Sequence, residues 1–286
     1  MSADTTFAFP PLATLLPEAA SKSPETSWAD DPACPRAGEV GLLALVELVL
    51  KSPARLHQLL RDTTGQLALL WRLLAISLLS FVLYGVAMSL VLSATGHWPT
   101  LAHVPMWLRG EGPALLTFTD LAAPRGALAP WLSGAAFKLT AAYAFGLIAA
   151  TGVCLPSLYF YCLLSGIPLT MVDVVLHAVK AKAVAAVALV GILPLYAAVA
   201  MGAAVFGAPR VTLEAALLLG LALPFLAGLW GTQSLYHGFA QVAARCHCQP
   251  ESRHCFLRRL VLSWSACYAA VVPVMVFSLW EVFSRV

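Results

Sequence analysis

Beyond residue 66, long apolar stretches alternate with short polar connections. Five such stretches cover roughly residues 67–92, 135–164, 183–205, 213–240 and 260–283. Each is near or above the roughly 20 apolar residues that a helix needs to cross a lipid bilayer. Four of them contain a proline, which membrane helices tolerate because neighbouring helices can hydrogen-bond the freed carbonyl groups. The pattern predicts an all-α integral membrane protein with about five transmembrane helices.

Two segments of different character precede this transmembrane domain, residues 66–286. Residues 1–37 are rich in Pro, Ser, Thr, Asp and Glu and lack the apolar core of a signal peptide, so we expect a disordered cytoplasmic tail. Within residues 38–65, Ser52 and Pro53 are typical of a helix start, and Leu56, Leu59 and Leu60 then share one face. We expect amphipathic helices in the membrane interface there; the alternative is a docking helix for a cytosolic partner.

Composition and charge place this chain in the membrane class and suggest an orientation. Hydrophobic residues make up 60% of the chain, charged residues 11%, and the mean hydropathy is +0.83. With a cytoplasmic N-terminus, 12 of the 17 Lys and Arg residues lie on the cytoplasmic side, among them Lys180 and Lys182, just before the third stretch. Five lie on the opposite side: Arg109, Arg125, Lys138, Arg210 and Arg285. The positive-inside rule therefore predicts N-in and C-out, with a long outer loop at residues 93–134.

The segment before the third stretch is a candidate functional face. Thr170 followed by Asp173 resembles a capping box, which predicts a helix that begins there near the cytoplasmic surface. Asp173, His177 and Lys180 are spaced four and three residues apart, so they share one helix face. Two interpretations stay open: a proton or metal relay, and a solvated face with Asp–His–Lys pairing.

The connection CHCQPESRHC, between the fourth and fifth stretches, is the candidate metal site. Its potential ligands are Cys246, Cys248, His254 and Cys255. Thiolates and imidazoles are zinc ligands, but only one residue separates the first two cysteines, which is tighter than usual for zinc. Pro250 favours a turn in the middle that would bring the two ends together.

Three residues on the same side could complete such a site: Asp173, His177 and His237. A disulfide is disfavoured, because the predicted orientation places the loop in the reducing cytosol. Zinc is therefore the one cofactor that the sequence suggests, against the alternative of an incidental loop. No catalytic motif is present, and no intramembrane carboxylate pair of the kind that drives proton-coupled transport. We expect a protein that is not an enzyme and does not bind nucleic acid.

A resemblance adds to this picture. The stretches FVLYGVAMSL, LPSLYFYCLLSG and GILPLYAAVA, within residues 52–205, resemble a family of uncharacterised bacterial polytopic membrane proteins. The five-helix layout is similar to that of the Yip family. The resemblance implies a multi-pass protein of the bacterial inner membrane, and the last third of the chain departs from it.

Three functions are compatible with these observations. The first is a non-enzymatic scaffold or accessory subunit of a membrane complex, whose partners are the lipid bilayer and other proteins. The second is the permease subunit of an exporter driven by a separate ATPase. The third is a metal- or redox-responsive membrane sensor that uses the cysteine loop.

Overall fold

The computed structural model describes residues 41–51, 56, 59–60, 65–101, 116–120, 126–164, 170–243 and 250–285. Five of the described helices are long and apolar enough to cross a membrane, which confirms the predicted all-α membrane fold. They are α3 (Gln66–Ala94), α6 (Ala135–Leu164), α7 (Met171–Val205), α8 (Arg210–Ala243) and α9 (Pro250–Arg285). The expected tail, residues 1–37, lies outside the described residues.

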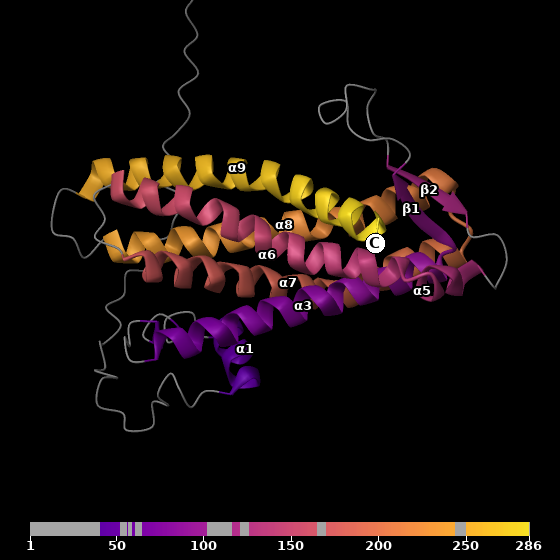
Figure 1. Ribbon diagram of the computed structural model, residues 1–286, viewed down its shortest axis with the longest axis horizontal. Coiled ribbons are helices and arrows are strands. Elements are labelled where there is room, and N and C mark those ends of the chain that lie inside the picture. Colours follow the sequence, from indigo (N-terminus) through magenta and orange to yellow (C-terminus); the bar gives the residue numbers. More distant parts are fainter. Residues whose placement is uncertain are drawn as a thin grey trace, which may run out of the picture. The chain divides into compact units, whose positions relative to one another are not determined.

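The five long helices lie lengthwise in one bundle (Figure 1), and their contacts with one another form a closed ring. α3 packs against α6 and α7, α7 packs against α8, and α9 completes the ring between α8 and α6. Because successive helices run in opposite directions, the bundle has two ends. The "α1 end" holds the start of α3 and the connections α6–α7 and α8–α9. The "hairpin end" holds the connections α3–α6 and α7–α8.

α7 and α9 begin before their apolar stretches, because the more polar residues that precede each stretch belong to the same helix. Thr170 caps α7: its Oγ1 accepts from the Asp173 N–H at 3.2 Å, and the Asp173 carboxylate accepts from the Thr170 N–H at 3.1 Å. The predicted capping box is therefore confirmed. The prolines expected inside four stretches do lie inside α6, α7, α8 and α9.

Glycines allow the helices to approach closely. A Cβ atom at Gly85 of α3 would lie 3.0 Å from the Cα of Thr140 on α6. At Gly146 of α6 it would lie 3.0 Å from the Cα of Val276 on α9. Small residues at these two positions therefore allow close contact between helices of the same chain, as is common in membrane proteins.

The connection from α3 to α6 contains elements that the sequence analysis did not predict. β1 (His97–Leu101) pairs with β2 (Leu116–Asp120) in antiparallel register, with His97 opposite Asp120. The 3-10 turn η3 (Gly126–Leu128) and the short helix α5 (Ala129–Leu132) follow. Trp98 is buried, and Trp131 Nε1 donates to Ser93 Oγ at 3.1 Å, so these elements are attached to the end of α3.

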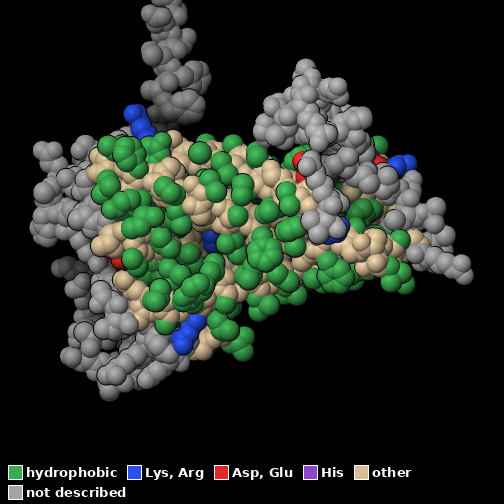
Figure 2. Space-filling view, in the orientation of Figure 1, with side chains coloured by type: hydrophobic (Ala, Val, Ile, Leu, Met, Phe, Trp, Pro, Cys, Tyr) green, Lys and Arg blue, Asp and Glu red, His purple; other side chains and the backbone are tan. Residues whose placement is uncertain are grey.

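The segment before α3 also packs on the bundle. α1 (Leu42–Lys51) contacts α3 and α7. A second apolar cluster joins this segment to both helices; its members are Leu45, Val49, Leu56, Leu60, Leu69, Leu73, Ile76, Leu176, Val179 and Ala183. The apolar face predicted at Leu56 and Leu60 is therefore buried against the chain's own helices. Leu43 and Leu50 of α1 stay exposed, as do many large apolar side chains on the bundle surface (Figure 2).

Candidate functional site

A polar cluster lies inside the bundle, where α6, α7, α8 and α9 meet. It is centred on Lys182 of α7, whose Nζ donates to the hydroxyl oxygen of Tyr268 on α9 and lies 3.7 Å from the centre of that ring. Tyr268 in turn donates to the Leu147 carbonyl of α6 at 3.3 Å. A lysine amine is thus held inside a candidate membrane span, about 16 Å along α7 from Met171 at 1.5 Å per residue.

Aromatic contacts fix this cluster between α6 and α9. The Trp264 and Tyr268 rings stack with their centres 5.4 Å apart. Trp264 Nε1 donates to the Cys154 carbonyl at 3.0 Å, and the same carbonyl accepts from Ser157 Oγ at 2.7 Å. Buried indole and phenol groups need such partners in an apolar medium, so these bonds set the register of the two helices.

A small cavity adjoins Lys182 and Tyr268. Its other walls are Ala178, Ala181, Ala185, Gly228, Gly231, Thr232, Leu235 and Trp264. Its volume, about 10 Å³, is close to what one water molecule needs. A lysine, a phenol and a threonine border it, so it is polar enough to hold one.

Thr232 also borders a larger groove on the outside of the bundle, between α8 and α9. This "α8–α9 groove" has a volume of about 460 Å³ and is lined by Leu229, Thr232, Gln233, Tyr236, Val261, Leu262 and Ser265. Two of its hydroxyl groups are bonded to their own helices: Thr232 Oγ1 donates to Leu229 O at 2.8 Å, and Ser265 Oγ to Val261 O at 2.6 Å. The side chain of Gln233 is exposed. The groove therefore offers apolar walls with a few polar groups.

Three tyrosines brace α8 near its proline. Pro224 lacks an N–H, so the carbonyl of Gly220, four residues earlier, loses its helical partner. Tyr84 of α3 donates to that carbonyl instead. Tyr143 of α6 donates to Leu221 O at 3.0 Å. A third tyrosine, from α7, bonds the carbonyl of Ala216 one turn earlier. Hydrogen bonds from α3, α6 and α7 therefore stabilise the part of α8 in which its proline favours a kink.

The three residues predicted to share one helix face, Asp173, His177 and Lys180, have different surroundings. The Asp173 carboxylate accepts from the Thr170 backbone and hydroxyl groups, and Gln66 Nε2 donates to it at 3.5 Å. His177 is buried with its ring 5.7 Å from that of Phe239. Lys180 is also buried, so the interpretation of a solvated face is wrong for these two residues. The cause is that α7 enters the bundle within two turns of its start.

The predicted metal ligands cannot all be placed. Cys246 and Cys248 lie outside the described residues. The backbone of His254 and Cys255 is helical within α9, and their side chains are not described. Pro250 begins α9; proline is well suited to the first helical position, where no N–H bond is lost. The residues just before it, 244–249, lie outside the described ones, so the predicted turn stays a prediction.

The helper residues do not come together either. His237 is exposed on α8 with its ring 5.8 Å from that of Tyr236. Within the described ranges, no group of three His, Cys, Asp or Glu side chains is close enough to hold a metal ion. A zinc site at the loop stays a prediction.

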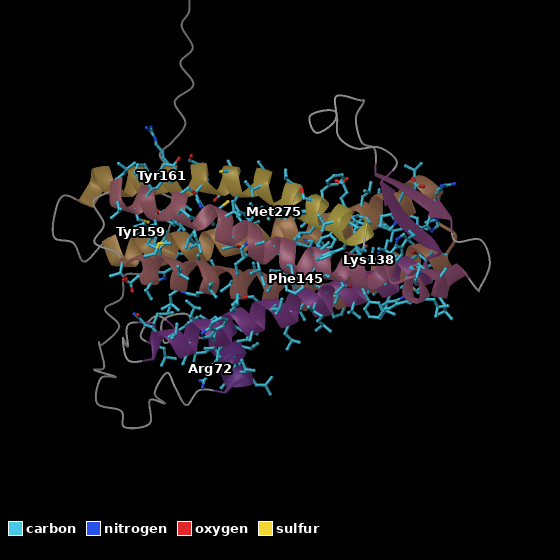
Figure 3. All side chains as sticks on the ribbon, viewed as in Figure 1. Arg72, Lys138, Phe145, Tyr159, Tyr161 and Met275 are labelled. Atoms are coloured by element: carbon cyan, nitrogen blue, oxygen red, sulfur yellow. The ribbon has the colours of Figure 1, made fainter. Side chains whose placement is uncertain are left out.

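Sequence reasoning missed Lys182 as a site residue because it counted this lysine as an inner-side charge at the edge of the third stretch. Figure 3 labels two basic residues that lie near opposite ends of the bundle, Arg72 on α3 and Lys138 on α6. Lys182, by contrast, is half-buried where α7 meets Tyr268 of α9. The signal that could have found it is its place in a continuous helix that begins at Thr170.

These features define the class: an integral membrane protein with five candidate spanning helices and a polar cluster inside the bundle. Comparison of the chain with known protein families, with curated proteins and with solved structures finds no match.

Proposed function

We propose that the protein is a non-enzymatic accessory subunit of a membrane complex, and that it binds a transmembrane helix of its partner in the α8–α9 groove. The observation that carries the proposal is the groove itself, a volume of about 460 Å³ on the surface of two spanning helices. Surfaces of this kind accommodate the side chains of another helix.

The polar lining favours a helix over lipid chains alone. Gln233 presents an amide at the level of a candidate span, where water is scarce. An amide there gains by bonding a polar side chain or a backbone carbonyl of another helix, a contact worth about 1–2 kcal/mol in model helices. Tyr236 adds an aromatic wall with a hydroxyl group. The partner helix is therefore expected to carry small residues and at least one polar side chain.

The interior of the bundle supports a scaffold in preference to a carrier. Large apolar side chains from all five helices fill it, among them Tyr84, Leu139, Leu158, Leu189, Leu217 and Val272, each at most 2% exposed. Glycine contacts then bring α3 to α6, α6 to α9 and α7 to α8. The groove lies outside this packed interior.

The orientation is part of the same proposal. The excess of Lys and Arg on the predicted cytoplasmic side supports a cytoplasmic N-terminus and an outer C-terminus. The inner membrane of a bacterium is proposed on the family resemblance alone. The exposed Leu43 and Leu50 of α1 lie on the same helix face as the Glu47–Lys51 pair, whose atoms are 2.8 Å apart, and such a mixed apolar and polar face supports contact of α1 with the membrane interface.

Photo-crosslinking tests the proposal. A benzophenone amino acid is placed at Gln233 of the full-length protein in its native membranes, and crosslinked peptides are identified by mass spectrometry. We expect a product with one defined transmembrane segment. The matched control is the same group at Leu79, a lipid-exposed position of α3. Equal patterns from the two positions, or lipid adducts alone at Gln233, would overturn the proposal.

A further inference from the structure

The amine of Lys182 lies deep in the bundle, far from the ends of the helices around it. It donates to the Tyr268 hydroxyl, and Tyr268 is seven residues, or about 10 Å, inside the candidate span Val261–Phe283 of α9. Tyr268 donates in turn to the carbonyl of Leu147, which is 17 residues, or about 25 Å, from the α1 end of α6. At this depth the surroundings of the amine are protein and hydrocarbon.

The bonds of this amine within the chain leave room for an acidic partner. An ammonium group has three N–H donors, and one of them goes to Tyr268, whose ring centre is 3.7 Å away. Among the side chains that the structure describes, no Asp or Glu forms an ion pair with Lys182. Asp173, on the same helix, is nine residues earlier and belongs to the capping box. Ionisable residues in membrane helices usually pair with one another, so this amine fits a carboxylate from outside the chain.

The α8–α9 groove lies next to the amine. Thr232 of α8 lines both this groove and the small cavity beside Lys182. The two spaces also adjoin on α9, because Trp264 lines the cavity and the following residue, Ser265, lines the groove. Lys182 is half-buried, and its amine sits on a flexible four-carbon stem. A side chain that enters the groove at the level of Thr232 therefore approaches the amine.

Charge complementarity indicates what such a side chain carries. The groove lining itself is apolar or neutral, so Lys182 supplies the positive charge at this level. A lipid chain would fill the groove without offering an acceptor, and a free inorganic anion is poorly soluble in hydrocarbon. A transmembrane helix with an acidic residue offers both an apolar surface and two acceptor oxygens.

We propose that Lys182 forms an ion pair with an Asp or Glu side chain on the transmembrane helix that binds in the α8–α9 groove. The proposal rests on the proposed function and adds the charge by which the partner is selected. The same lysine excludes a helix with a basic side chain at this depth, because like charges repel strongly where the dielectric constant is low.

Synthetic helices test the charge without changing the protein. Each is a transmembrane helix of leucine and alanine that carries a fluorophore and one central Asp, Asn or Lys. Binding to the full-length protein, labelled at its N-terminal amine, is measured by energy transfer in phosphatidylcholine liposomes. We expect the Asp helix to bind about 30-fold more tightly than the Asn helix, at the lower end of the range for loss of one partner of a buried charge pair. The Lys helix should not bind.

Variants of the protein locate the charge that the helix recognises. Lys182→Met should bind the Asp and Asn helices equally weakly, whereas Lys182→Arg keeps the positive charge and should keep the preference for Asp. The matched control is Lys138→Met, which removes a half-buried lysine near the other end of the bundle and should also keep the preference (Figure 3). Circular dichroism checks the fold of each variant; if Lys182→Met does not fold, the helix series on the unchanged protein decides.

Two results would overturn the ion pair: equal binding of the Asp and Asn helices to the unchanged protein, or a preference for Asp that persists in Lys182→Met. Displacement of the Asp helix by added phosphatidylglycerol would assign the amine to a lipid phosphate and would overturn it as well.

The crosslinking experiment at Gln233 separates this inference from the proposed function. A defined crosslinked segment that contains no Asp or Glu would overturn the ion pair and leave the role as an accessory subunit standing. Binding of the Asp helix that depends on Lys182, with no defined segment at Gln233 in native membranes, would support the ion pair and overturn that role.

Discussion

Replacing Gly231 with alanine tests how closely α7 and α8 approach each other. A Cβ atom at this position would lie 2.8 Å from the carbonyl oxygen of Ala181 and 3.3 Å from the Cβ of Ala185. The first neighbour is a backbone atom, so it cannot rotate away. The two helices would have to separate by about 0.6 Å to reach the 3.4 Å of an ordinary contact.

Gly228 provides a matched control one turn earlier on α8. A Cβ atom there meets nothing within 4 Å. Both substitutions gain roughly 1 kcal/mol of helix propensity, because glycine is that much less favourable than alanine in a helix interior. The difference between the two variants therefore isolates the cost of overpacking, which is typically about 1–3 kcal/mol. We expect Gly228→Ala to be the more stable variant by this amount.

Reversible unfolding in mixed detergent micelles, followed by circular dichroism, measures the two free energies of unfolding. Every sample contains a reductant, so that disulfide formation does not enter the comparison. Equal stability of Gly231→Ala and Gly228→Ala would refute the close contact of α7 and α8 and, with it, the position of Lys182 next to Tyr268.

Three further predictions concern single contacts. Tyr143→Phe removes a hydroxyl group that bonds α8 near its proline, and should lower the free energy of unfolding by about 0.6–1.7 kcal/mol, whereas Tyr161→Phe, at a more exposed position of α6, should not. Thr170→Ala should cost about 0.5–2 kcal/mol in the same assay, and Thr170→Ser should restore most of it, because serine keeps the capping oxygen. The hydrogen bond from Lys51 lowers the pKa of Glu47, so the pair stabilises α1 above the ordinary glutamate pKa and loses this effect as the pH falls through the lowered value. Carboxyl NMR titration of the Lys51→Met variant should show the Glu47 pKa rise again; an unchanged titration would contradict the ion pair.

The sequence predicted the number and order of the spanning helices well, because hydrocarbon permits few alternatives to a long apolar helix. The capping box at Thr170 and Asp173 was predicted for a similar reason: it is a local signal that depends on neighbouring residues alone.

Features that depend on contacts between distant parts of the chain were not predicted. The pairing of β1 with β2 joins segments of no strong alternation, and its register depends on contacts with the end of α3. The tyrosine braces of α8 join residues more than 70 positions apart in two of three cases, so no local spacing reveals them. Lys182 was assigned to the membrane surface because a charge at the edge of an apolar run usually marks its boundary.

The candidate site illustrates the same limit. The loop at Cys246–Cys255 was the candidate metal site because cysteines and histidines are dense in it. The structure instead brings together Lys182 and Tyr268, which lie in separate helices, α7 and α9. A contact of this kind becomes apparent only when the packing of two helices that are distant in the sequence is known.

Filling the α8–α9 groove tests the proposed role as an accessory subunit most directly. Ser265→Trp places an indole in the groove, and Ser263→Trp places the same group on an exposed position of α9 outside the groove lining. The mass of the complex, extracted from native membranes in mild detergent, is measured by native mass spectrometry. We predict that Ser265→Trp releases the partner and leaves the folded protein alone, while Ser263→Trp keeps the complex. A complex that survives Ser265→Trp with unchanged mass would contradict the account.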